Sequence, residues 1–473
     1  MAKYKAYPEY KDSGVEWLGM IPTEWKISHF KWLTNDGKSF ASGPFGSSIG
    51  SKFYQEYGVP VIRGNNLSIN GEKPFFKDSG YVYLDDAKAD ELSNAEVIAG
   101  DLVFTARGTV GQVGLIPADS TLSWNRAILS ANQLRYRTDL RKYNSSYLWY
   151  QFSSWFIRTQ ITLSSDSVAQ PNLNLGSLKA LNIIVPPLMV QKAIADFLDH
   201  ETAKIDNLIE KQQQLIELLK EKRQAVISHA VTKGLNPDVS MKDSGVEWLG
   251  KVPAHWGVMP VKYVCALIKD GTHLPPPRVE NGIPLLSVRN IIGGVFQFRD
   301  DDSQISHKDY KSLCSSFIPK KDDVLLAIVG ATLGKVALVP EMDSFHIQRS
   351  LGVFRTNKLI HPQHLSYIFE SKDFQNLLWE NAGFSAQPGI YLGTLSNFCV
   401  PVPPVTEQLK ISEFITATVD KLDLLITQAS KLIGLIQERR TALISAAVTG
   451  KIDVRDWVAP DTQDVEEPQE ATA

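Results

Sequence analysis

Two copies of one long segment decide the architecture of this 473-residue chain: VPPLMVQKAIADFLDHETAKIDNLIEKQQQLIELLKEKRQAVISHAVT (Val185–Thr232) and VPPVTEQLKISEFITATVDKLDLLITQASKLIGLIQERRTALISAAVT (Val402–Thr449). They align at a constant offset of 217 residues (402 minus 185) without a gap. Apolar residues recur in both copies at steps of three, four or seven, which is the spacing of a narrow seam on an α-helix. The seam positions are Ile194, Leu198, Ile205, Leu208, Leu215, Leu219 and Val226 in the first copy, and Ile411, Ile415, Leu422, Leu425, Leu432, Ile436 and Leu443 in the second.

Helix signals mark both ends of each copy. Pro187 and Pro404 suit the first turn of a helix, where a missing N–H costs nothing, and Gly234 and Gly450 suit helix ends. About 46 residues at 1.5 Å each form a rod of roughly 69 Å, which cannot bury its seam alone. We predict that the two helices pack on each other as an antiparallel pair with a pseudo-two-fold axis. In the alternative arrangement, each helix packs only on its own domain.

A shorter repeat extends the duplication toward the beginning of the chain. The nonapeptide KDSGVEWLG occurs at residues 11–19 and at 242–250, followed each time by a proline and a tryptophan at fixed offsets. The second copy directly follows the first long helix, whereas no helix precedes the first copy. An antiparallel pair would bring the end of the second helix to the first nonapeptide, as though the chain were circular. We expect the tryptophans to pack against the helix ends, with direct contact to a partner as the alternative: Trp17, Trp25, Trp248 and Trp256.

The regions between the repeats have a mixed α/β pattern. Short β-rich runs such as VPVIRG and DDVLLAIVG are bounded by Gly, Asn and Asp, as strands and their turns are. We predict an α/β (α+β) fold with two mixed α/β domains, joined by two long antiparallel coiled-coil helices in a circularly organised repeat. The predicted order is an N-terminal segment at the helix ends (1–25), a first domain (26–184), a central helix (185–235), the repeated segment (242–256), a second domain (257–401), a C-terminal helix (402–452) and an acidic, disordered tail (453–473).

Composition narrows the class of protein. The formal net charge of −3 argues against a surface that is positive throughout, but it allows local basic patches. The longest apolar run, at 180–190, has eleven residues and contains two adjacent prolines, so we expect no membrane span. The three cysteines are widely spaced and match neither a disulfide framework nor a metal motif. Because the N-terminus also lacks the apolar core of a secretion signal, we expect a cytoplasmic protein.

Basic and amide side chains concentrate in the loops between the predicted strands. Arg and Asn have the geometry for bidentate hydrogen bonds to guanine and adenine. The loop GPFGSSIGSK (43–52) departs from a P-loop, because Gly46 and Gly50 enclose three residues and Ser51 precedes Lys52. It stays a candidate backbone-amide cradle for a DNA phosphate. The candidates for DNA contact are Lys52, Arg63, Asn65, Asn66, Arg107, Arg126, Arg135, Arg137, Lys269, His273, Arg278, Arg289, Asn290, Arg299, Lys335 and Arg349.

Catalytic motifs are absent from the sequence. It has no HExxH, no GxSxG and no Walker-type lysine loop. His361 and His364 lie three residues apart without a carboxylate or Cys companion, so we expect no metal site. VPPL and VPPV lack both the acidic or amide residue and the aromatic residue that flank Pro-Pro in adenine methyltransferases. We therefore expect a chain that is not itself an enzyme.

Taken together, the repeated motifs resemble those of a known family, the specificity subunits of type I restriction-modification systems. The resemblance covers the chain to about residue 455. It rests on WLGMIPTEW and WLGKVPAHW, on GPFGSSIGSKFYQEYGVPVIRGNNL, on AQPNLNLGSLKALNIIVPPLMVQKAIADFL, on AQPGIYLGTL followed by VPVPPVTEQLKISEFI, and on the order and duplication of these motifs.

The resemblance implies a DNA-reading scaffold in a bacterial or archaeal cell. Each α/β domain would be a target recognition domain for one half of a bipartite DNA site, and the helices would set the gap between the halves. The partners would be double-stranded DNA, two modification (methyltransferase) subunits and restriction (translocase and nuclease) subunits. S-adenosylmethionine, ATP and Mg²⁺ would be bound by those partners, and no cofactor by this chain.

Two other functions remain open from the residues alone. The chain could be a pseudo-symmetric coiled-coil adaptor whose globular ends bind proteins and no DNA. It could also be a self-sufficient methyltransferase, which methyl transfer by the chain alone would demonstrate. Selection from a random DNA pool separates the adaptor from the DNA reader, because only the reader enriches a motif in two parts.

Overall fold

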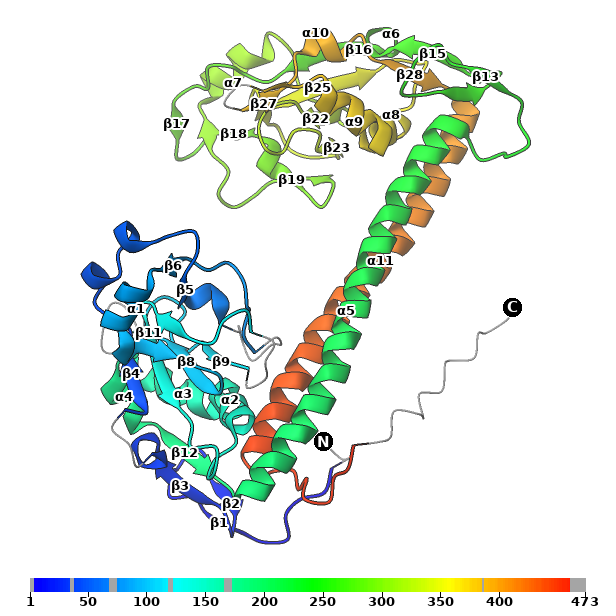
Figure 1. Ribbon diagram of the computed structural model, residues 1–473. Coiled ribbons are helices and arrows are strands. Elements are labelled where there is room, and N and C mark those ends of the chain that lie inside the picture. The colour runs from blue at the N-terminus through cyan, green and yellow to red at the C-terminus, as the bar shows by residue number, and fades with distance from the viewer. Residues whose placement is uncertain are drawn as a thin grey trace. The chain divides into compact units, whose positions relative to one another are not determined.

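The computed structural model describes residues 4–34, 38–67, 75–117, 122–165, 172–384 and 387–459. The chain divides into two compact units (Figure 1): unit 1 comprises Met1–Lys211 with Leu432–Ala473, and unit 2 comprises Gln212–Lys431. Each unit holds one mixed α/β domain together with one part of each long helix. No helix in these described ranges is long and apolar enough to cross a membrane.

The two predicted long helices are α5 (Leu188–Lys233) and α11 (Val405–Val448). In unit 1, Arg440 Nε of α11 donates to Asp206 Oδ1 of α5 over 2.8 Å. In unit 2, Arg223 Nε of α5 lies 3.1 Å from Asp423 Oδ1 of α11. Arg223 comes 17 residues after Asp206 in α5, and Asp423 comes 17 residues before Arg440 in α11. The helices therefore run antiparallel, as predicted. At the 217-residue offset Asp206 corresponds to Asp423 and Arg223 to Arg440, so the two ion pairs are copies of each other.

The predicted seam is wrong at four leucines. Each is followed directly by an isoleucine, and the isoleucine is the more buried of the two, as in Leu208-Ile209 and Leu425-Ile426. One partner helix covers only a narrow stripe of the surface, so only one residue of each adjacent pair can face it. The exposed leucines are Leu208, Leu215, Leu425 and Leu432, whereas Leu219 and Ile436 are half-buried.

Unit 1 contains two four-stranded sheets. One has the order β4-β11-β8-β9 and is antiparallel throughout; the other has the order β6-β5-β10-β7, with β5 and β10 parallel. In β8, Leu102 and Phe104 enter one core while Val103 enters another, because successive side chains of a strand point to opposite faces. The strands are β4 (Phe40–Ser42), β5 (Val59–Ile62), β6 (Tyr83–Leu84), β7 (Glu96–Val97), β8 (Asp101–Thr105), β9 (Val113–Leu115), β10 (Ala127–Leu129) and β11 (Gln133–Arg137).

Unit 2 repeats this plan with an enlarged sheet. Its six-stranded sheet has the order β16-β25-β22-β23-β20-β19, and its four-stranded sheet has the order β17-β21-β18-β24. Strand β22 also feeds two cores, with Leu326 in one and Leu325 in the other. The strands are β16 (Cys265–Asp270), β17 (Arg278–Val279), β18 (Ile283–Leu286), β19 (Ile291–Ile292), β20 (Val295–Phe296), β21 (Gln304–Ile305), β22 (Val324–Ala327), β23 (Val336–Leu338), β24 (His346–Ile347) and β25 (Leu351–Thr356).

The 217-residue offset also relates residues that precede the long helices. Gln191 Oε1 accepts from Asn144 N (3.0 Å), and its counterpart Gln408 Oε1 accepts from His361 N (2.7 Å). In each domain, a glutamine near the start of the long helix therefore binds the backbone just before a pair of shorter helices. The matching elements are α2 (Ser145–Ser153), α3 (Trp155–Ser165), α4 (Leu175–Ala180) and β12 (Asn182–Val185) in unit 1, and α8 (Pro362–Glu370), α9 (Lys372–Glu380), α10 (Leu392–Leu395) and β28 (Cys399–Val402) in unit 2.

The repeated nonapeptides form two equivalent hairpins, β1-β2 (Tyr10–Asp12, Met20–Pro22) and β13-β14 (Met241–Asp243, Lys251–Pro253). After each hairpin a buried tryptophan covers a helix end: a Cβ added at Gly450 would lie 3.1 Å from the ring of Trp25, and one at Gly234 would lie 3.2 Å from Trp256. Trp17 and Trp248 depart from the prediction. They pack on α3 and α9 instead, with Trp17 against Phe156 (5.1 Å) and Trp248 against Phe374 (5.9 Å).

The predicted tail begins too early. Asp453 N donates to Lys5 O (2.7 Å), Val454 is only 1% exposed, and the ring of Trp457 lies 5.5 Å from that of Phe197. These residues follow α11 and pack on the N-terminal segment within unit 1, because their apolar side chains complete its core. The remainder of the predicted tail, from residue 460, lies outside the described residues.

Candidate nucleic-acid interface

One edge of the main sheet is built alike in both units. In unit 1 the chain leaves β4 at Gly43, whose N–H donates to Gln133 O (2.8 Å); in unit 2 it leaves β16 at Gly271, whose N–H donates to Leu351 O (3.1 Å). A Cβ at Gly43 would lie 1.8 Å from Ser130 O, and one at Gly271 would lie 2.3 Å from Gln348 O. Only glycine fits such close backbone approaches. The two glycines therefore start equivalent loops, 43–52 and 271–278.

In unit 1 this edge is hollowed by a cavity of about 470 Å³. Its wall includes Gly46 and Gly50 of the first loop, Arg63, and Arg107 just after β8. Arg107 is exposed and has no side-chain partner among the described residues, and no acidic residue lines the cavity. Its surface is therefore positive and rich in backbone groups, which suits a nucleic-acid backbone or base edge.

Arg63 lines the same cavity, but a hydrogen bond to the protein backbone holds its side chain in place. Its Nη2 donates to Gly80 O (2.7 Å), while its Nε is buried without a partner among the described residues. A buried guanidinium N–H without a partner is costly, so the side chain gains from a ligand oxygen that reaches it. Arg63 thus has one donor that no described residue uses.

Unit 2 has a cavity of about 700 Å³ at the equivalent edge. It is lined by Ile328 and Val329 just after β22, by Arg349 just before β25, and by Asp270 and His273. His273 Nε2 lies 2.7 Å from Asp270 Oδ2, and the Arg349 side chain is exposed without a partner among the described residues. The two domains therefore offer one accessible arginine each, just after β8 in unit 1 and just before β25 in unit 2.

Three of the residues predicted to contact DNA are buried inside the fold. Asn66 is fully buried: its Nδ2 donates to Lys77 O and Ser79 O, and its Oδ1 accepts from Arg63 N. Asn290 is equally buried and repeats the motif in unit 2, with its Oδ1 accepting from Ser287 N. Arg135 donates to the backbone oxygens of Glu96 and Lys38. These predictions are wrong, because each side chain is buried and hydrogen-bonded to the backbone of the segments around it.

Five further candidates are engaged with nearby acids. Arg137 makes a bidentate pair with Asp101 in β8 (2.9 Å for each bond), which Arg355 and Asp323 repeat in unit 2. The hydrogen bonds that Arg126 donates to Asp90 and Asp86 raise its pKa above the usual range. The five side chains and their acidic partners are Arg126 (Asp90), Arg137 (Asp101), His273 (Asp270), Arg289 (Asp301) and Arg299 (Asp301).

The remaining candidates are exposed at the surface. Lys52 lies over the ring of Phe53, with its Nζ 4.8 Å from the ring centroid. The others have no side-chain partner among the described residues: Asn65, Arg107, Lys269, Arg278, Lys335 and Arg349. Sequence reasoning missed several cavity-lining residues, among them Tyr54 in unit 1 and Tyr391 in unit 2. Their only signal in the sequence is that each lies close to the end of a strand or helix.

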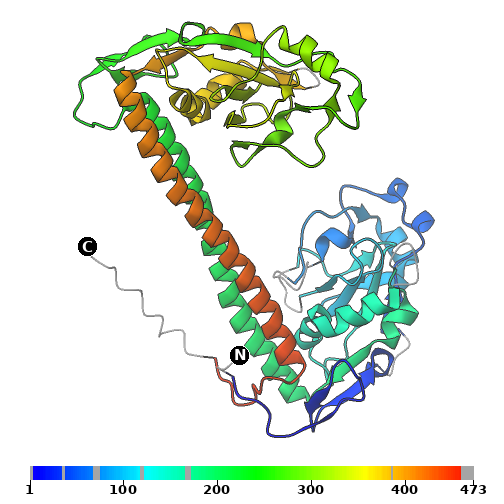
Figure 2. The same cartoon turned by 180° about the vertical axis from the view of Figure 1, so that it is seen from behind.

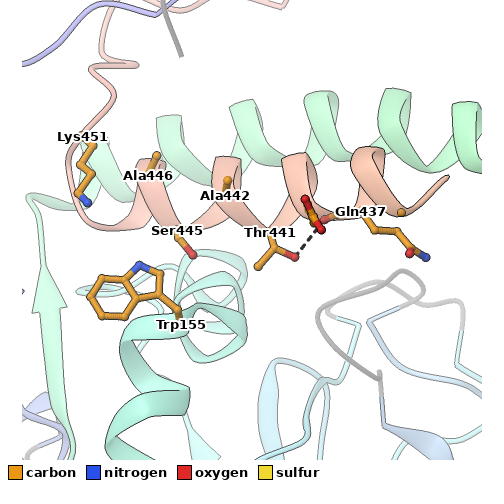
Figure 3. A pocket seen from close by; sticks show the side chains of 9 residues that line it. Trp155, Gln437, Thr441, Ala442, Ser445, Ala446 and Lys451 are labelled. Atoms are coloured by element: carbon orange, nitrogen blue, oxygen red, sulfur yellow. Dashed lines mark hydrogen bonds between the residues drawn. The ribbon is translucent and has the colours of Figure 1, made fainter. Parts of the chain in front are cut away.

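A second hollow in unit 1 lies away from the sheet edge. Figure 3 shows this groove of about 660 Å³ between Trp155 and the last turns of α11, where Thr441, Ala442 and Ser445 face it. Ser445 Oγ is buried and has no partner in the part of the chain that the structure describes, whereas its counterpart Ser228 in unit 2 accepts from Lys372 N (2.9 Å). Lys451 is the only basic residue among those lining it, so this groove is a poor candidate for DNA.

The described residues contain no group of three or more His, Cys, Asp or Glu side chains that could hold a metal ion. The functional surface recognised in these ranges is therefore a pair of equivalent, arginine-bearing cavities on two mixed α/β domains. Such a surface can bind and discriminate among ligands.

Comparison with known proteins places this arrangement in a family. The model of the type I restriction modification DNA specificity domain matches residues 48–218 and 254–433, one match in each half of the chain. The chain is 25% identical over 390 residues to the type I restriction enzyme MjaVIII specificity subunit of Methanocaldococcus jannaschii, covering 79% of this chain and 85% of that protein. It is 23% identical over 441 residues to the EcoBI specificity subunit of Escherichia coli, covering 91% and 88%.

Solved structures share the fold. A chain described under "Structural basis underlying complex assembly and conformational transition of the type I R-M system" superposes with a TM-score of 0.69 at 15% identity, covering 91% of this chain and 99% of that one. The HsdS subunit from Thermoanaerobacter tengcongensis gives a TM-score of 0.51 at 15% identity, covering 91% and 98%. Because the family model matches most of the chain, the chain belongs to the type I restriction modification DNA specificity domain family, and its role is DNA sequence recognition in a restriction-modification system.

Proposed function

We propose that each α/β domain reads one half of a bipartite DNA site and that the paired helices set the gap between the halves. The observation that carries this proposal is the repetition of one cavity at one sheet edge in two domains of diverged sequence. Each cavity carries one exposed arginine, Arg107 just after β8 or Arg349 just before β25, so the two arginines occupy different positions in the two domains. Two readers with different donor positions would select two different half-sites.

Exposed leucines on the helices support docking of two modification subunits. In unit 1 they include Leu208, Leu432 and Leu435, and in unit 2 they include Leu425, Leu215 and Leu218; unit 2 also exposes Leu409 and Leu424. At the 217-residue offset Leu425, Leu215 and Leu218 correspond to Leu208, Leu432 and Leu435, in that order. Each unit thus displays the same apolar patch, and such patches mark protein-binding surfaces. Two copies of one patch suit two copies of one partner.

We assign the chemistry of the complex to its other subunits, in the cytoplasm of a bacterial or archaeal cell. S-adenosylmethionine would be bound by the modification subunits, and ATP and Mg²⁺ by the restriction subunits. The modest net charge of −3 accords with partners that share the phosphate contacts. The role of this chain is then to choose the sequence and hold the subunits on it.

Selection from a random duplex pool tests the proposal. The purified complex of this chain with its modification subunits is expected to enrich one motif in two parts, separated by a gap of constant length. Replacing residues 26–184 with another recognition domain should change one half of that motif only. A pool without a two-part motif would show that the chain is not a DNA reader, and a change in both halves would contradict the modular assignment.

A further inference from the structure

The two equivalent loops, 43–52 and 271–278, each carry one highly exposed apolar side chain, and we call these two positions the loop tips. Phe45 follows Gly43 by two residues and Leu274 follows Gly271 by three, and both side chains are 87% exposed. The neighbours Gly46 and His273 line the two cavities. We propose that Phe45 and Leu274 are the apolar contacts through which the two domains recognise thymine methyl groups in the major groove. This inference rests on the proposed function and deepens it.

The first loop holds its tip in one conformation. Phe45 lies between Pro44 and Gly46, and its carbonyl accepts from Ser48 N (2.8 Å) to open the turn η2 (Gly46–Ser48). Ile49, only 2% exposed, then anchors the loop in a core. The side chain is exposed although the backbone beneath it is fixed, so binding would order little further backbone.

The second loop reaches the same result with different residues. Thr272 Oγ1 donates to Leu274 O (3.0 Å), and Thr272 O accepts from Arg349 N (3.1 Å). Pro275, Pro276 and Pro277 follow Leu274 and limit the backbone angles on its C-terminal side. Two diverged sequences thus each fix one apolar residue at equivalent loop tips. A single exposed leucine or phenylalanine is ordinary on a protein surface, but its repetition beside the reading cavity in both domains is not.

The chemistry of the base edges selects the ligand. In the major groove, thymine alone presents a methyl group, and apolar side chains are the groups that contact it. Arg107 and Arg349 beside the tips supply donors for the acceptor atoms of neighbouring bases. A loop with an apolar tip and an adjacent guanidinium can therefore read a thymine next to a guanine. A phosphate contact alone would leave Phe45 and Leu274 without a role.

The test compares thymine with uracil, which lacks only that methyl group. The wild-type complex first yields its bipartite site, and each thymine of the site is then replaced singly by uracil in synthetic duplexes. One replacement in each half should weaken wild-type binding by roughly fourfold, the value of about one buried methyl group. Phe45→Ala should bind the thymine and uracil duplexes equally in one half-site, and Leu274→Ala should do so in the other.

Controls separate the tip from any exposed apolar residue and from folding. Leu140→Ala in unit 1 and Ile318→Ala in unit 2 remove exposed apolar side chains that lie outside the loops 43–52 and 271–278, and both should keep the thymine preference. Phe45→Leu, which keeps an apolar tip, should retain most of it. All variants should melt at the wild-type temperature, because the altered side chains are largely in water.

The outcomes distinguish this inference from the proposed function. If the wild-type complex selects a bipartite site and Phe45→Ala still discriminates thymine from uracil as the wild type does, the inference is wrong and DNA reading stands. A site in which no thymine is sensitive to the replacement overturns the inference in the same way. If the wild-type complex selects no bipartite site, the proposed function itself fails.

Discussion

At the scale of single residues, three arginines of one short stretch have three different roles. Arg107 projects from the end of β8 without a partner among the described residues, Arg135 is buried against backbone oxygens, and Arg137 is clamped on Asp101. A guanidinium can read DNA only if its donors are not already used inside the fold. From the sequence all three arginines were equal candidates for DNA contact, because the linear order of residues does not tell which acceptor lies next to each side chain in the sheet.

Arg107→Ala should therefore impair recognition of one half-site and leave the other intact. The expected loss is between about 5-fold and 100-fold, as for removal of one base-reading arginine. Binding of duplexes mutated in each half in turn measures it, with Arg349→Ala as the reciprocal variant. Asn66→Ala is the contrast: it should lower the free energy of unfolding by about 1–3 kcal/mol, because buried backbone groups lose their partner. An equal loss at both half-sites from Arg107→Ala would contradict this assignment.

Glu370 should make unit 2 sensitive to pH. Burial raises its pKa from 4.5 to about 7; Arg223 opposes the shift and Asp423 adds to it. Because the folded state binds the proton of Glu370 more tightly than the unfolded state does, protonation of Glu370 stabilises the fold. This contribution is fully present below the unfolded pKa of about 4.5 and is lost as the pH rises through about 7. Glu370→Gln should stabilise the chain at about pH 8 by at most about 3 kcal/mol and flatten the dependence. Denaturant midpoints across pH measure both, and an unchanged slope would refute the role of Glu370.

At the scale of elements, the long helices show what a periodic pattern can and cannot specify. Their existence, their antiparallel direction and the equivalence of their ion pairs follow from the 217-residue repeat. The pattern failed at adjacent apolar pairs such as Leu208-Ile209, where either residue continues the period. Contact with the partner helix makes the choice, and the leucines left outside form the proposed docking patches.

The two equivalent ion pairs should differ in strength. Arg440 is only 5% exposed beside Asp206, whereas Arg223 is 26% exposed beside Asp423. Asp206→Ala leaves a buried guanidinium without its carboxylate and should cost about 2–3 kcal/mol. Asp423→Ala should cost less than about 1 kcal/mol, since the pair is solvated and Arg223 keeps Glu370 nearby. Denaturant unfolding of the two variants compares them directly, and equal losses would contradict the difference in burial.

At the scale of the whole molecule, duplication explains the chain from end to end. The N-terminal hairpin receives the end of α11, and its copy receives the end of α5. Within unit 1 the Asp453–Lys5 hydrogen bond joins the two ends of the described chain. Figure 2 shows the blue N-terminal segment beside the red end of the chain. In unit 1 the end of α11 therefore meets the hairpin β1-β2 through noncovalent contacts, whereas in unit 2 the chain runs directly from α5 into the hairpin β13-β14. The circular organisation predicts this difference.

Shortening the helices should change the gap in the DNA site. Deleting four residues within Leu208–Leu219 and the matching four within Leu425–Ile436 removes about 6 Å of helix. The selected motif should then keep both half-sites and lose one or two base pairs between them. Selection from the random pool with the deletion variant measures the gap, and a gap of unchanged length would rule out the helices as its determinant.

The sequence by itself determined the duplication, the mixed α/β class and the antiparallel helix pair. Repetition and periodicity are properties of linear order, so they survive without coordinates. Only the tertiary structure decided which arginines and asparagines face a ligand and which leucines face solvent. Asn66 and Asn290 look like base readers in the sequence, yet both hold loops together. The physical reason is that hydrogen-bond satisfaction and burial depend on neighbours that the fold brings from distant parts of the chain.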